Sequence, residues 1–126
     1  MKKAIAMSIG MALMIGTAII ARAHENVKLT GYLVDAMCAA SHMKSHPENA
    51  DAFAAGHTKG CALMPECVES GYGIISGGKW YAFDAKGNEL AKAIFDKTDK
   101  KDHISATVEG MEHDGKIMVE KLTAGE

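Results

Sequence analysis

The chain has 126 residues, of which 48% are hydrophobic, and it carries 14 basic and 16 acidic side chains for a formal charge of −2. This length allows one domain with one small core. The slightly acidic charge balance argues against nucleic acid as a partner, because binding to phosphates requires a basic face.

The first 23 residues have the pattern of a secretory signal peptide. Met1–Lys3 is a basic start, residues 4–20 are apolar and uncharged, and Ala21-Arg22-Ala23 is an A-x-A cleavage site. An uncharged run of 17 residues is short for a membrane span. We therefore expect cleavage after Ala23. The remaining single domain, residues 24–126, would be periplasmic or secreted, without stable membrane insertion.

Cleavage there would make His24 the first residue of the mature chain. A terminal histidine can chelate copper through its α-amino group and its imidazole. Most secreted proteins that begin with histidine do not use it in this way, so the sequence alone assigns no role to His24.

Alternating apolar and polar residues predict a first strand over residues 27–34, in which Gly31 suggests a bulge or a bend. Residues 72–76 and 79–84 predict two more strands. They flank Gly77-Gly78, which is typical of a tight hairpin turn.

The last third of the chain predicts one helix and two strands. Asn88 is the expected N-cap of the helix, whose apolar side consists of Leu90, Ala91, Ile94 and Phe95. Residues 103–109 and 116–122 alternate again, and the turn at 112–115 joins them.

This order of elements is that of an OB-fold, a five-stranded Greek-key barrel. We expect a mainly β, OB-fold-like barrel with one helix between strands 3 and 4. An enlarged Cys/His loop would connect strands 1 and 2. The alternative is an open antiparallel sheet with the helix packed on one face.

All three cysteines lie in this loop segment, residues 36–67, together with three of the six histidines. Residues 49–55 predict a short helix ended by Gly56. From Cys61 to Ser70 the apolar residues recur at helical spacing, so Pro65 must occupy a first helical turn or break the run.

The segment offers ligands for a soft metal ion. Cys38 and His42 are four residues apart, so on a helix they would share one face, and Cys61 and Cys67 approach from the other end of the loop. Three thiolates and one imidazole suit zinc, and nearby methionines would also suit Cu(I). However, C-x₅-C is not the C-x₂₋₄-C spacing of common zinc sites.

Two other interpretations of the cysteines stay open. In an oxidising compartment two of them could form a disulfide that closes the loop, leaving a structural or interaction domain without metal. A thiol redox protein is the third interpretation, although no C-x-x-C occurs. If strands 1 and 2 are neighbours, Cys38 should lie within reach of Cys61 or Cys67 under any interpretation that joins the sulfurs.

A family resemblance points to the same residues. The pattern is Gly31-x-x-x-Asp35-x-x-Cys38, then His42, Cys61, Cys67-Val68-x-x-Gly71 and Gly78-Lys79-x-Tyr81-x-x-Asp84. It resembles a group of small exported bacterial proteins, mostly of unassigned function. The resemblance implies an OB-like fold with a cysteine-bearing loop and no particular reaction. Independently of this resemblance, the position of Asp35 at the end of the first predicted strand favours a helix cap. We expect a small binding protein for a metal ion or a protein partner.

Overall fold

The computed structural model describes residues 24–126, so the predicted signal peptide lies outside the described residues. The architecture is a closed five-stranded barrel whose neighbouring strands follow the order β1-β2-β3-β5-β4. The strands are β1 (Glu25–Asp35), β2 (Tyr72–Ser76), β3 (Lys79–Phe83), β4 (Ser105–His113) and β5 (Lys116–Ala124). Of these pairs only β3–β5 is parallel. The predicted barrel is therefore confirmed, and the open-sheet alternative is wrong because β4 closes onto β1.

β1 is long enough to pair with two neighbours. Residues Glu25–Tyr32 pair with β4, and residues Tyr32–Asp35 pair with β2. Gly31 lies where this changeover begins, and a Cβ there would be 2.1 Å from the backbone oxygen of Ile75. Position 31 is therefore glycine because the backbone of β2 comes too close for a side chain. The sequence suggested a bulge or a bend at Gly31, but the register shift that the structure contains lies in the β4–β5 pair, between Glu109 and Gly110.

The predicted β2–β3 hairpin is confirmed. Gly77 and Gly78 have φ values of 56° and 76°, the left-handed conformations that a tight turn between these strands needs.

The helix between β3 and β4, α5 (Ala85–Lys97), begins earlier than predicted. Its N-cap is Asp84, whose Oδ1 accepts a hydrogen bond from the Gly87 backbone N–H at 3.0 Å. The prediction of Asn88 as the cap is wrong. Asn88 lies inside the helix, and its Oδ1 accepts from the Tyr72 N–H at 2.8 Å, which ties α5 to β2.

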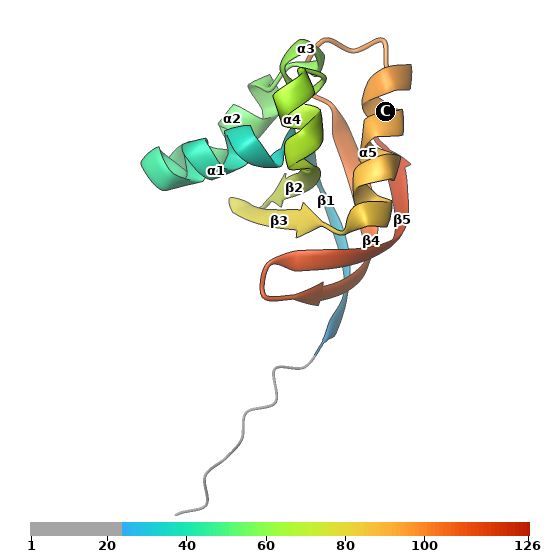
Figure 1. Ribbon diagram of the computed structural model, residues 1–126. Coiled ribbons are helices and arrows are strands. Elements are labelled where there is room, and N and C mark those ends of the chain that lie inside the picture. The colour runs from blue at the N-terminus through green and yellow to red at the C-terminus, as the bar shows by residue number, and fades with distance from the viewer. Residues whose placement is uncertain (1–23) are drawn as a thin grey trace, which may run out of the picture.

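The connection between β1 and β2 is largely helical rather than an irregular loop. It contains α1 (Ala36–Ser45), the 3₁₀ turn η1 (Pro47–Asn49), α2 (Ala50–Gly56), α3 (Lys59–Ala62) and α4 (Pro65–Ser70). Pro65 occupies the first turn of α4, where its missing N–H costs nothing. These helices gather at one end of the barrel, while α5 lies along another side (Figure 1). Helices make up about 42% of the described residues and strands about 38%.

The buried apolar residues form two clusters. The larger fills the barrel and extends under α5, with Leu33, Ile74 and Phe95 at 1% exposure or less. The smaller lies between the barrel and the helical insertion, and its members are Val34, Ala39, Ala50, Ala54 and Ile75. The insertion is therefore packed onto the barrel. Within the described residues, no helix is long and apolar enough to cross a membrane.

Candidate metal centre

Asp35 is the last residue of β1 and the N-cap of α1. Its Oδ1 accepts a hydrogen bond from the Cys38 backbone N–H at 2.9 Å, so its interpretation as a helix cap is confirmed. The cap also fixes the position of Cys38, because the thiol projects from the first turn of the helix that Asp35 starts. The Asp35 side chain is completely buried, at 0% exposure.

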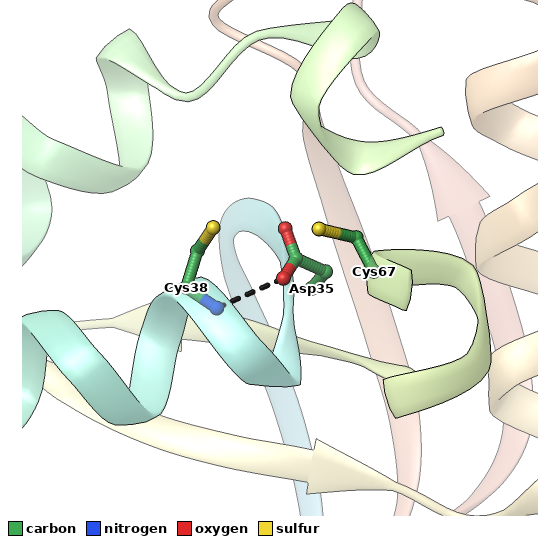
Figure 2. Close-up of side chains that lie close together, drawn as sticks. All are labelled: Asp35, Cys38 and Cys67. Atoms are coloured by element: carbon green, nitrogen blue, oxygen red, sulfur yellow. Dashed lines mark hydrogen bonds between the residues drawn. The ribbon is translucent and has the colours of Figure 1, made fainter. Parts of the chain in front are cut away.

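Cys67 reaches the same place from α4, which packs against α1. Ser70 joins the two helices: its Oγ accepts from the Met37 N–H at 3.2 Å and donates to the Cys67 carbonyl at 2.7 Å. As a result, one carboxylate oxygen of Asp35 and the sulfurs of Cys38 and Cys67 all lie within 4.8 Å of one another. Figure 2 shows the carboxylate between the two sulfur atoms, with the cap hydrogen bond to Cys38 beside them. We call these three residues the Asp/Cys/Cys group.

His57 adds an imidazole next to this group. Its Nε2 is 2.7 Å from Asp35 Oδ2, and its side chain is 4% exposed. The two groups form a buried contact at ion-pair distance, and neither atom has another hydrogen-bond partner among the described residues.

The charges of the Asp/Cys/Cys group favour one carboxylate and two protonated thiols. Burial alone would raise the pKa of Asp35, but His57 and the Cys38 N–H outweigh it and hold this pKa below its ordinary value. Burial, followed by the charge of Asp35, raises the pKa of Cys38 to about 12 and also raises that of Cys67. Neither thiol has the lowered pKa that a redox-active thiolate requires.

The structure brings together two of the four predicted ligands. Cys38 and Cys67 converge as expected, whereas Cys61 is exposed on α3. His42 lines the same surface pocket as Cys38, and its ring stacks on Phe53 with centroids 4.0 Å apart. Its Nε2 is buried without a hydrogen-bond partner. All three cysteines are free thiols, so the structure contains no disulfide among them.

Sequence reasoning did not include Asp35 or His57 among the ligands. Asp35 carried a signal, since it is the last residue of a strand and lies three residues before Cys38. His57 carried none, because its contact with Asp35 depends on how α2 folds back over β1.

Comparison with family models, with curated proteins and with solved structures finds no match. The chemistry of the site is therefore argued from its own geometry.

Proposed function

We propose that this protein binds a thiophilic divalent metal ion, best suited to zinc, through Asp35, Cys38 and Cys67. The observation that carries the proposal is the convergence of three donor atoms within 4.8 Å of one another at the boundary of β1, α1 and α4. The donors come from positions up to 32 residues apart, 35 to 67, so sequence proximity does not explain the grouping.

The donor set favours zinc over Cu(I). Zinc accepts thiolate, imidazole and carboxylate ligands, while Cu(I) selects sulfur. Without a cation, two thiolates beside the Asp35 carboxylate would be three negative charges in a buried place, which agrees with the raised pKa values of both thiols. A divalent ion would replace the two thiol protons and offset most of that charge.

Zinc sites have four ligands, so a fourth donor is required. His42 was among the ligands predicted from the sequence, and its unpaired Nε2 and its place beside Cys38 support it as that donor. His57 is the second candidate, or it orients the Asp35 carboxylate as an outer hydrogen-bond partner. Cys61 is exposed and does not belong to the Asp/Cys/Cys group.

The wider setting of this proposal is an exported OB-fold protein. The strand order β1-β2-β3-β5-β4 and the position of α5 between β3 and β4 support the OB-fold assignment. The pattern of residues 1–23 supports export through a signal peptide to the periplasm or the exterior.

A disulfide between Cys38 and Cys67 is the second candidate, because their sulfurs are already close. It would stabilise the insertion by closing a loop, by about 3 kcal/mol. A disulfide and a metal exclude each other at these two sulfurs. Intact mass after alkylation separates them, since the oxidised pair takes up no reagent.

Zinc affinity measured against a competing chelator tests the proposal. Cys38→Ser and Cys67→Ser should each weaken zinc binding by at least tenfold, whereas the control Cys61→Ser removes an exposed thiol of the same chain and should leave binding unchanged. Equal affinity in all three variants would refute the proposed site.

A further inference from the structure

A pair of histidines lies where the described chain enters the barrel, separate from the Asp/Cys/Cys group. His24 directly precedes β1, and His113 is the last residue of β4. The β1–β4 register pairs Glu25 with Glu112, so the next antiparallel position places His24 opposite His113. Their ring centroids are 4.7 Å apart with planes inclined by 36°. This is the separation of cross-strand neighbours, and it brings two imidazoles from opposite ends of the chain together.

Charges of both signs surround the pair: Lys116 lies directly opposite His113 on β5, whereas Asp114, Glu25 and Glu112 are acidic neighbours. His113 Nε2 lies 3.3 Å from Asp114 Oδ2, a carboxylate contact of the kind that orients metal-binding imidazoles and leaves the other ring nitrogen available. Glu25 and Glu112 are directly opposite each other at the neighbouring position, which is an unfavourable pairing of like charges. Adjacent strand residues point to opposite faces, so these acids contribute negative potential rather than ligands.

We propose that the mature chain binds Cu²⁺ here through three nitrogens: the α-amino group and imidazole of His24, and the imidazole of His113. This inference rests on the proposed export, because cleavage after Ala23 creates the α-amino group beside the His24 ring. Amine and imidazole of one residue form a chelate, and His113 supplies the third donor. Three nitrogen donors suit the tetragonal geometry that Cu²⁺ prefers. The site requires none of the cysteines.

The test compares Cu²⁺ binding to a chain that begins at His24 with binding to a chain that begins at Ile20, in which four further residues precede His24 and its ring is too far from the α-amino group for a short chelate. All proteins in this comparison carry Cys38→Ser, Cys61→Ser and Cys67→Ser, so that thiols do not reduce the ion. With one equivalent of Cu²⁺, electron paramagnetic resonance should show nitrogen ligands in the chain that begins at His24. Its affinity should fall at least tenfold on adding residues 20–23 or on His113→Ala. The control His46→Ala removes another exposed imidazole beside a carboxylate, that of Glu48, and should have no effect.

If the triple serine protein does not fold, the chain with native cysteines is titrated with Ni²⁺, which thiols do not reduce. Broadening of the His24 and His113 ring resonances by nuclear magnetic resonance is then the readout. Affinity or broadening that is the same with and without residues 20–23, or with and without the His113 imidazole, would overturn the proposal. The proposal also requires that the exported protein begin at His24. Amino-terminal sequencing that finds a different first residue would overturn copper binding through the His24 α-amino group in the natural protein. Loss of zinc binding at the Asp/Cys/Cys group would refute only the proposed function, since it changes neither His24 nor His113.

Discussion

The two oxygens of Asp35 serve different parts of the molecule. Oδ1 accepts from the Cys38 N–H and begins α1, while Oδ2 lies 2.7 Å from His57 in the helical insertion. The same carboxylate lies between the sulfurs of Cys38 and Cys67. Changes at Asp35 should therefore affect helix capping, insertion packing and metal binding, and the variant chosen decides which of these is measured.

Asp35→Asn separates capping from charge, because asparagine caps helices as well as aspartate does. We expect zinc affinity to fall by tenfold or more. The metal-free protein should lose about 1–3 kcal/mol of stability, because His57 loses its charged partner in a buried place. Chelator competition and urea unfolding measure the two effects.

The matched control is Asp84→Asn, since Asp84 caps α5 in the same way but has no thiols beside it. Its zinc affinity should equal that of the unchanged chain. A similar loss of affinity in both variants would mean that the effect comes from capping, and Asp35 would not be a ligand.

Tyr72 gives a second prediction at the residue scale, in alkaline solution. Its hydroxyl donates to the Ala62 carbonyl at 2.7 Å, and burial, with the charge of Asp35 next, raises its pKa to about 12. The unfolded chain loses this proton near pH 10, so between pH 10 and 12 the stability should fall, by up to about 1.4 kcal/mol per pH unit. Tyr72→Phe should lack this contribution and should lose about 1–2 kcal/mol at pH 7, where the Ala62 carbonyl is left unpaired.

Urea unfolding at pH 7 and at pH 11 tests this prediction for both proteins. The Cys38 thiol, whose pKa is also raised, contributes the same alkaline loss in each. If stability fell equally steeply in the Tyr72→Phe protein, the tyrosine would not be the group responsible.

At the scale of elements, the close approach of β1 and β2 depends on Gly31. Gly31→Ala would place a Cβ 2.1 Å from the Ile75 carbonyl oxygen, so the two strands must separate. We expect a loss of about 2–4 kcal/mol, in the range of severe overpacking. Because β1 leads into Asp35, zinc affinity should fall as well.

Gly56→Ala is the control for this change. Gly56 ends α2, and a Cβ there meets nothing within 4 Å. The substitution should be neutral or stabilise the protein by up to about 1 kcal/mol. Thermal unfolding that found the two glycine variants equally stable would contradict the close packing of β1 on β2.

The strands were predictable because each shows its alternation locally. The starts of the helices were harder to predict from the sequence. Asp84 and Asn88 are both residue types that cap helices. The structure decides between them, because Asp84 accepts from the Gly87 N–H at the helix start and Asn88 accepts from the Tyr72 N–H instead. Convergence of Cys38 with Cys67 followed from β1 and β2 being neighbours. The exclusion of Cys61 did not, because it depends on the rotation of α3, a four-residue helix with little sequence signal of its own.

At the scale of the whole molecule, metal binding should stabilise the fold. The ligands come from β1, α1 and α4, so one ion would join the barrel to both ends of its helical insertion. Zinc at 100 times its dissociation constant should add about 2.7 kcal/mol to the free energy of unfolding. For a domain of this size that corresponds to a rise in melting temperature on the order of 10 °C. No rise with added zinc would contradict a native-state site.

The most direct test of the Asp/Cys/Cys group is to substitute Co²⁺ for zinc and record the thiolate-to-cobalt charge-transfer band. We predict a band from two thiolates in a four-coordinate site, reduced by Cys38→Ser and by Cys67→Ser, abolished in the double variant and unchanged by Cys61→Ser. A band that Cys61→Ser also reduces would mean that all three cysteines bind the ion. The complete absence of a band in fully reduced protein would contradict a metal centre at these thiols.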